Sequence, residues 1–134
     1  MSAHLLTVDG ISKSFRGLRA VSAASLTVPQ GSIVSLIGPN GAGKTTCFNM
    51  IAGVFKPDEG SISFEGRRID GLRPDLICHA GIGRTFQIVK PFKELTALQN
   101  VIVGALRTEP DVRVARRKAE AVLDRLGMLD KRDQ

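Results

Sequence analysis

The sequence from residue 32 to residue 46 reads Ser32-Ile33-Val34-Ser35-Leu36-Ile37-Gly38-Pro39-Asn40-Gly41-Ala42-Gly43-Lys44-Thr45-Thr46. Its first six residues form a short apolar run, which is typical of a strand buried in a parallel sheet. Residues 44–52 are compatible with a helix, and Gly53 follows as a natural left-handed cap. The segment therefore predicts a buried strand, a glycine-rich loop and a helix in direct succession.

The loop between this strand and this helix fits the pattern Gly-x4-Gly-Lys-[Ser/Thr]. Glycines let successive backbone N–H groups point into a concave nest around anionic oxygens, and the positive end of the following helix points at the same place. Lys44 adds a full positive charge for the β- and γ-phosphates, and the Thr45 hydroxyl is a ligand for Mg²⁺. Thr46 is placed to reach the α-phosphate.

We therefore predict a site for a nucleoside triphosphate, ATP with Mg²⁺. Its candidate residues in the loop are Gly38, Pro39, Asn40, Gly41, Ala42, Gly43, Lys44, Thr45 and Thr46. The strand pattern before the loop and the helix pattern after it are the context that this motif requires.

Further elements are indicated on both sides of the loop. Residues 5–8, 20–28 and 61–65 alternate in the manner of strands, and residues 74–79 resemble a short helix. Thr96 and Gln99 form a capping box for a helix that reaches about residue 106. A second helix, from about 111 to 126, ends at Gly127 and has apolar positions that predict one buried face: Val112, Ala115, Ala119, Val122, Leu123 and Leu126.

Composition limits the classes of protein that remain. The 134 residues suit one domain, and the chain has neither a signal-peptide pattern nor an apolar run long enough to cross a membrane. The net charge of +6 would suit nucleic acid, but basic and acidic residues are interleaved, and Trp and Tyr are absent. We expect a cytoplasmic protein that does not bind nucleic acid.

Several stretches together resemble the nucleotide-binding domain of ABC transporters. Besides residues 37–46, these are the lead-in of residues 11–21, the strand region of residues 60–66, the stretch Arg84-Thr85-Phe86-Gln87 and the helix start of residues 96–101. The resemblance implies an α/β fold of the P-loop NTPase (RecA-like) class with an antiparallel β-subdomain and the start of a helical subdomain. It also implies three parts: residues 1–66 with the β-subdomain and P-loop unit, 67–95 with the Q-loop region, and 96–134 as a partial helical subdomain.

The resemblance assigns roles to residues outside the loop. Phe15 takes the place of the aromatic residue that stacks on adenine, and Val21 belongs to the same lead-in. Gln87 takes the place of the Q-loop glutamine, which reaches Mg²⁺ and the attacking water. Thr45 and Gln87 are therefore the expected Mg²⁺ contacts.

Residues 80–87 and 91–96 are similar, more narrowly, to ATP-binding subunits of bacterial branched-chain amino acid importers. This similarity implies a membrane-spanning permease subunit that contacts the region after Gln87, and a second ATP-binding subunit as dimer partner. It also implies a location on the inner face of the cell membrane.

Some catalytic parts of that family have no counterpart among these residues. Residues 88–134 contain no apolar strand that ends in Asp, no Leu-Ser-Gly-Gly-Gln-like signature and no switch His. We expect a truncated domain, roughly its first half, that binds ATP without hydrolysing it alone. We also expect apolar surface and an unpaired sheet edge around the P-loop strand.

Other functions compete with this interpretation. A small-molecule kinase would need lid arginines, for which Arg67-Arg68 or Arg116-Arg117 are available, but no second Asp-ended strand supports it. A GTP-binding regulator would need an Asn-Lys-x-Asp element, which the sequence lacks. A non-catalytic assembly module stays open, because the sequence does not separate binding from turnover.

Overall fold

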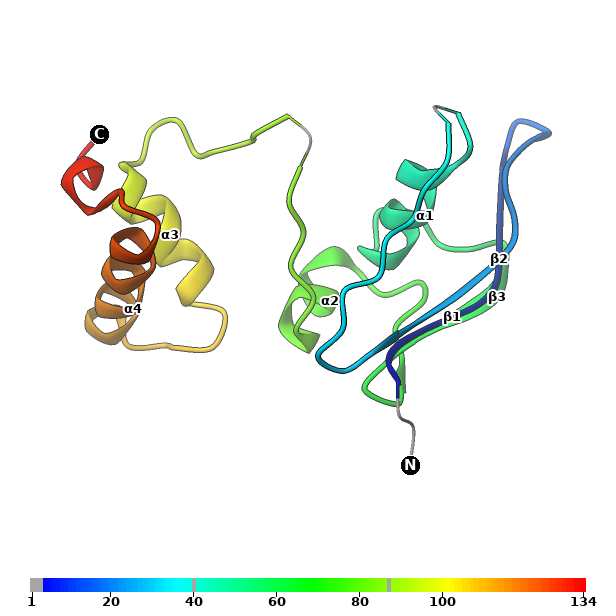
Figure 1. Cartoon of the computed structure of the whole chain (residues 1–134), viewed down its shortest axis with the longest axis horizontal. Coiled ribbons are helices and arrows are strands. Elements are labelled where there is room, and N and C mark those ends of the chain that lie inside the picture. Colours follow the sequence, from blue (N-terminus) through cyan, green and yellow to red (C-terminus); the bar gives the residue numbers. More distant parts are fainter. Residues whose placement is uncertain (1–3, 40, 87) are drawn as a thin grey trace. The chain divides into compact units, whose positions relative to one another are not determined.

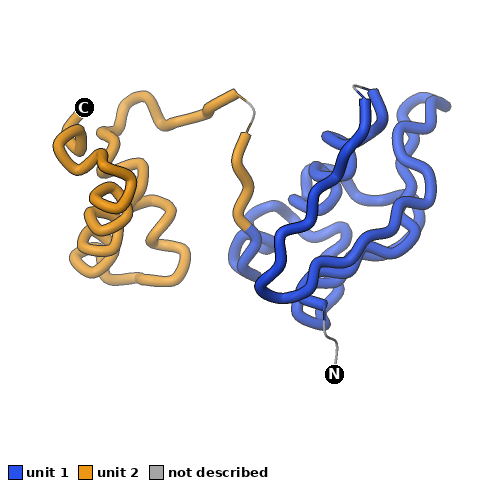
Figure 2. The backbone as a smooth tube through the Cα atoms, in the orientation of Figure 1, with its two compact units in different colours: residues 1–82 blue, residues 83–134 orange. Residues whose placement is uncertain are grey.

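A computed structural model describes residues 4–39, 41–86 and 88–134 (Figure 1). The chain forms two compact units, one ending at Ile82 and the other beginning at Gly83 (Figure 2). Each unit is considered by itself. The three-part division expected from the sequence is finer than these two units and stays a prediction.

The first unit is built on a four-stranded antiparallel sheet in the order β2-β1-β3-β4. The strands are β1 (His4–Phe15), β2 (Leu18–Pro29), β3 (Glu59–Phe64) and β4 (Arg67–Arg68). In the middle of the sheet Val8 is opposite Leu26 on one side and Ile62 on the other. The sheet confirms the predicted antiparallel part of the fold.

Two helices, α1 (Lys44–Ile51) and α2 (Pro74–Ala80), lie on one face of this sheet (Figure 1). Cys47, Met50 and Ile51 form the buried side of α1, at the spacing expected for one helical face. They join a single cluster with apolar residues of the strands, of the segment after β4 and of α2: Val8, Ile11, Val21, Ile62, Ile69 and Ile77. The mixed α/β character predicted from the sequence is confirmed.

The predicted parallel strand at residues 32–37 is wrong for this structure. The segment has no strand partner among the described residues, and the side chains of Ile33 and Ile37 are 98% and 90% exposed. A parallel strand requires neighbours along its edges and cover on its faces, and these come from residues distant in sequence. Apolar composition alone therefore did not determine the pairing.

The second unit pairs α3 (Ala97–Ala105) with α4 (Val112–Arg125) and ends in a short 3-10 turn, η1 (Leu129–Lys131). The capping box is confirmed, because Thr96 Oγ1 accepts from the Gln99 N–H while Gln99 Oε1 accepts from the Thr96 N–H. Gly127 has a φ of 71°, as expected for a residue that ends a helix.

The buried face of α4 is narrower than its sequence pattern predicted. Ala115, Ala119 and Leu123 are buried, whereas Val122 is 46% exposed, and Val112 and Leu126 are more exposed still. One partner helix covers only the stripe at a spacing of four residues, so the flanking apolar positions stay in contact with solvent. The predicted helix is confirmed, but the breadth of its buried face is wrong.

Candidate nucleotide-binding site

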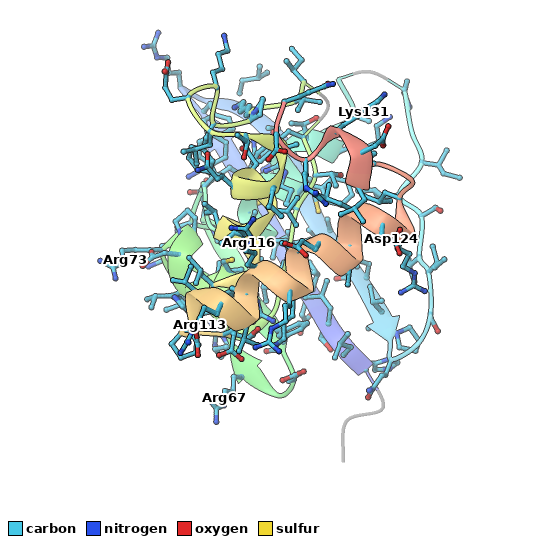
Figure 3. The ribbon with its side chains drawn as sticks, turned by 90° about the vertical axis from the view of Figure 1, so that its left-hand side faces the viewer. Arg67, Arg73, Arg113, Arg116, Asp124 and Lys131 are labelled. Atoms are coloured by element: carbon cyan, nitrogen blue, oxygen red, sulfur yellow. The ribbon has the colours of Figure 1, made fainter. Side chains whose placement is uncertain are left out.

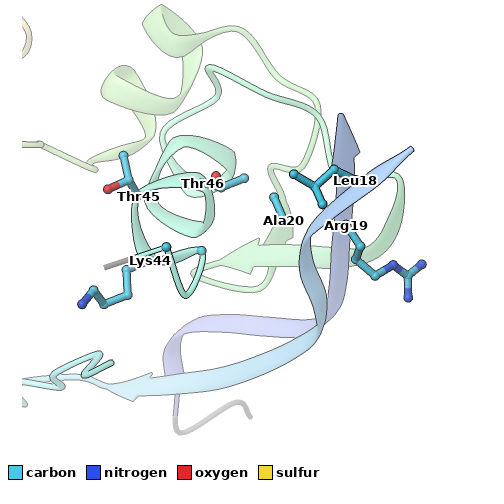
Figure 4. A pocket seen from close by; sticks show the side chains of 8 residues that line it. Leu18, Arg19, Ala20, Lys44, Thr45 and Thr46 are labelled. Carbon is cyan, nitrogen blue, oxygen red and sulfur yellow. The ribbon is translucent and has the colours of Figure 1, made fainter. Parts of the chain in front are cut away.

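An open cavity of about 510 Å³ lies between β2 and the N-terminal turn of α1 (Figure 4). The loop and helix side of the cavity carries Gly41, Gly43, Lys44, Thr45 and Thr46, and the strand side carries Leu18, Arg19 and Ala20. The structure therefore places most of the described part of the glycine-rich loop at a concave site of a size suited to a small ligand.

The start of α1 is prepared for an anion. Gly43 precedes the helix with a φ of 91°, no side chain among the described residues caps it, and its first turn has no acidic residue. The first backbone N–H groups of a helix have no partner within the helix, and the helix dipole adds partial positive charge there. A phosphate group can satisfy both features.

Two glycines give the loop its path. Gly41 and Gly43 have φ values of 87° and 91°, in the left-handed region that favours glycine. A β-carbon on Gly43 would also stand 2.4 Å from the carbonyl oxygen of Ala20. The loop therefore packs directly on β2 at a position where no side chain fits.

Lys44 folds back on its own loop. Its ammonium donates to the carbonyl oxygen of Gly38 and lies 3.5 Å from that of Pro39. Figure 4 shows the Lys44 side chain pointing away from Leu18 and Ala20. The two carbonyl oxygens thus hold the Lys44 ammonium beside the loop. Charged phosphate oxygens are stronger hydrogen-bond acceptors for an ammonium than neutral carbonyl oxygens are.

The structure also locates the two candidate residues of the lead-in. Val21 is buried and lines a second cavity of about 440 Å³ together with Ala42 and Lys44. Phe15 lines neither cavity: its ring meets that of Phe55 edge to face, with 5.0 Å between centroids, and Lys13 Nζ lies 5.5 Å from its centre. Val21 and the loop are brought together, while Phe15 is 38% exposed at the end of β1.

Two candidate residues, Asn40 and Gln87, lie outside the described residues. By contrast, Leu18, Arg19 and Ala20 line the cavity without having been predicted as site residues. Their signal is the hairpin itself, because β2 begins at Leu18 directly opposite Phe15. This register places them at the start of β2 opposite the end of β1, but their approach to the loop is a contact between residues distant in sequence.

Two of the four arginines considered for a kinase lid, Arg68 and Arg116, pair with carboxylates. Arg68 makes two hydrogen bonds to the Asp70 carboxylate, at 2.7 and 2.9 Å, and Arg116 pairs with Glu120 at 3.0 Å. Arg67 extends into solvent, and Arg113 and Arg116 project from α4 (Figure 3). These pairs give no support to the kinase alternative.

The glycine-rich loop lies beside the antiparallel sheet and leads directly into α1. This arrangement is that of a P-loop nucleotide-binding protein. The chain belongs to the ABC transporter family, since residues 21–134 match that family. The resemblance seen in the sequence is thereby confirmed. No helix in the described part of the chain is long and apolar enough to cross a membrane.

The relatives include proteins named as ATP-binding proteins of branched-chain amino acid transport. The "High-affinity branched-chain amino acid transport ATP-binding protein LivG" of Salmonella typhimurium is 41% identical over 97% of this chain and 57% of its own length. The corresponding BraF of Pseudomonas aeruginosa is 46% identical over 80% of this chain and 42% of its own. The chain thus spans about half the length of these curated relatives: 57% of LivG and 42% of BraF.

Solved structures give the same family. A nucleotide-free ATP-binding cassette from an ABC transporter matches 98% of this chain and 57% of its own, with a TM-score of 0.82 and 32% identity. An ATP-binding cassette in its ADP conformation matches 99% of this chain and 57% of its own, with a TM-score of 0.83 and 32% identity.

Proposed function

We propose that the chain binds Mg·ATP at the cavity between β2 and α1, as the nucleotide-binding portion of an ABC importer subunit. The observation that carries this proposal is the set of loop residues at that cavity, with glycines at positive φ and a helix start that lacks an acidic side chain. These features suit the phosphates of a nucleotide.

The residues divide the work by chemistry. The loop N–H groups and Lys44 hold the phosphates, the Thr45 hydroxyl and Gln87 contact Mg²⁺, and Thr46 reaches the α-phosphate. On the base side, Phe15 stacks on adenine, and Val21 of the same lead-in also contacts the nucleotide. For this contact the Phe15 ring presents the surface that Phe55 and Lys13 leave open.

The transported class is branched-chain or other amino acids, which the names of the relatives support. In the importer the subunit lies on the inner face of the membrane and works with a second ATP-binding subunit. Its contact with the permease is residues 88–95, the docking segment. Ile88 and Val89 are each 78% exposed and Phe92 is 57% exposed, which supports this contact.

Two cationic side chains lie near an aromatic ring just before the docking segment. Arg84 and Lys90 lie 5.3 and 5.1 Å from the centre of the Phe86 ring. This arrangement keeps an aromatic ring and two positive charges beside the exposed apolar residues. A partner surface that is both apolar and able to accept hydrogen bonds suits it best.

Hydrolysis needs groups beyond the phosphate cradle. The sequence of residues 88–134 has no apolar strand pattern that ends in Asp, so the Mg²⁺-holding carboxylate and the water-orienting carboxylate have no candidate there. Lost transition-state contacts of about 5–6 kcal/mol would slow the step about ten-thousandfold. The chain by itself therefore binds ATP without turning it over.

Two measurements on the purified chain test this proposal. Titration with labelled ATP and Mg²⁺ should give saturable binding that unlabelled ATP displaces, and failure to bind would overturn the proposal. Phosphate release should stay at background, with Lys44→Ala as the control for contaminating ATPases. Turnover of about one per second that disappears in that variant would show a complete catalytic site.

A further inference from the structure

The docking segment ends in a turn at Phe92–Leu95. The Leu95 N–H donates to the carbonyl oxygen of Phe92 at 3.1 Å and closes the turn directly before α3. All four turn residues are exposed, so neighbouring side chains do not fix the backbone here by burial. Apart from this hydrogen bond, the turn depends on polar contacts with its backbone.

The side chain of Asn100 supplies these contacts. Its Oδ1 accepts from the Phe92 N–H at 2.8 Å, and its Nδ2 faces the carbonyl oxygens of Phe92, Leu95 and Thr96 at 3.1, 3.3 and 2.9 Å. An amide group has both a donor and an acceptor, and here its two hydrogens are shared among three carbonyls. One side chain therefore grips both ends of the turn.

Capping of α3 does not explain these contacts. Thr96 and Gln99 complete the capping box between themselves, and the Ala97 and Leu98 N–H groups donate to the carbonyl oxygens of Gln134 and Arg132 at 2.7 and 2.9 Å. The buried cluster between α3 and α4 is likewise formed without Asn100. The side-chain amide of Asn100 instead makes hydrogen bonds to the backbone of the Phe92–Leu95 turn.

We infer that Asn100 is a positioning residue for the permease contact, holding the Phe92 turn in the shape that a membrane subunit binds. This inference rests on the proposed docking role of residues 88–95. It adds a residue that makes the surface rigid before binding, so that less conformational freedom is lost in the complex.

The first test needs no partner. In the whole 134-residue chain, Asn100→Ala should raise hydrogen exchange at the Phe92 amide about tenfold or more, because its acceptor is lost. The matched control is Gln99→Ala, which breaks the capping box in the same helical turn and should leave that amide protected. Unchanged exchange in Asn100→Ala, or equal increases in both variants, would overturn the inference.

The second test measures binding of the membrane subunits of a branched-chain amino acid importer, co-expressed with the chain. Asn100→Ala should lower their recovery several-fold with ATP affinity unchanged, and Gln99→Ala should not. Asn100→Asp keeps the acceptor for Phe92 but opposes a carboxylate to three carbonyls, so recovery should stay low; full recovery would overturn the two-ended grip.

The variant Phe92→Asp separates the two levels of the argument. If it abolishes recovery of the membrane subunits while Asn100→Ala leaves recovery intact, the inference about Asn100 fails and the docking proposal stands. If Phe92→Asp itself leaves recovery intact, the docking proposal fails, and the role of Asn100 fails with it.

Discussion

The backbones of Gly43 and Ala20 approach each other so closely that a β-carbon added to Gly43 would stand 2.4 Å from the Ala20 carbonyl oxygen. Real β-carbons do not approach an oxygen so closely. The contact joins the residue that opens α1 to the strand that lines the other side of the cavity. The width of the candidate site therefore depends on a glycine at position 43.

Gly43→Ala should destabilise the first unit by about 2–4 kcal/mol, since positive φ and overpacking both act there. Gly41→Ala is the matched control, because Gly41 has a similar φ of 87° but has nothing within 4 Å of its added β-carbon. Gly41→Ala should lower the free energy of unfolding by only about 1–2 kcal/mol. Urea unfolding measures both variants, and equal losses would show that the approach to Ala20 is unimportant.

Lys44→Ala should weaken ATP binding by about 2–3 kcal/mol, which is about thirty- to more than a hundredfold. The reason is the loss of charge-assisted contacts to phosphate. Lys56→Ala removes the same charge from the same unit, away from the cavity, and should leave affinity nearly unchanged. Unchanged titration curves for Lys44→Ala would remove the central claim.

Phe15→Ala should weaken ATP binding by about 1–2 kcal/mol if the ring stacks on adenine, and it should spare inorganic triphosphate. The structure supplies a control: Phe55→Ala removes the ring that meets Phe15 edge to face but leaves Phe15 in place. Calorimetric titration with both ligands tests the pair. Equal loss of the two ligands in Phe15→Ala would mark Phe15 as a packing residue.

Phe92→Asp should impair assembly with the permease while ATP affinity stays the same, because a charge would enter an exposed apolar contact. Leu126→Asp places the same charge directly after α4, where Leu126 is 65% exposed, and should not affect assembly. Co-purification with the membrane subunits is the measurement. Comparable recovery for the wild type and both variants would show that the docking segment does not contact the permease and only packs within the subunit.

Acid should weaken the first unit through Asp70. Hydrogen bonds from Arg68, together with one from the Ile62 N–H, lower the pKa of Asp70 from 3.8 to about 2. Because the folded pKa lies below the unfolded one, this stability is complete above about pH 4 and is lost as pH falls through about 2.

Asp70→Asn should therefore reduce the free energy of unfolding at pH 7 by about 1 kcal/mol, a modest value because the Arg68 guanidinium is open to solvent. The difference from wild type should shrink toward pH 2. Urea unfolding at pH 7, 4 and 2 measures it. A difference that is constant with pH would mean that the carboxylate charge makes no contribution.

Local signals were sufficient to predict several parts of the fold. Thr96 and Gln99 are three residues apart, and their capping box forms as expected. Gly53 and Gly127 follow their helices at positive φ, the conformation in which glycines commonly end helices. The glycine-rich loop belongs to the same group, since its motif specifies its own geometry.

Contacts between distant residues were not predictable in the same way. Phe15 meets Phe55 across forty residues of sequence, and nothing in either neighbourhood indicates the pair. The grip of Asn100 on the Phe92 turn depends on the path of a loop, which apolar periodicity does not describe. The strand expected at residues 32–37 failed for a related reason, since strand pairing is a property of two segments.

Those unpaired residues have a thermodynamic consequence for the ligand. The loop is anchored firmly on its α1 side, but on its other side it continues into exposed backbone with no strand partner in the described chain. If a nucleotide that fixes Gly38 also orders residues 32–37, each ordered residue costs about 1 kcal/mol in conformational entropy. The measured affinity would then be the attraction of the loop for the phosphates less this ordering cost.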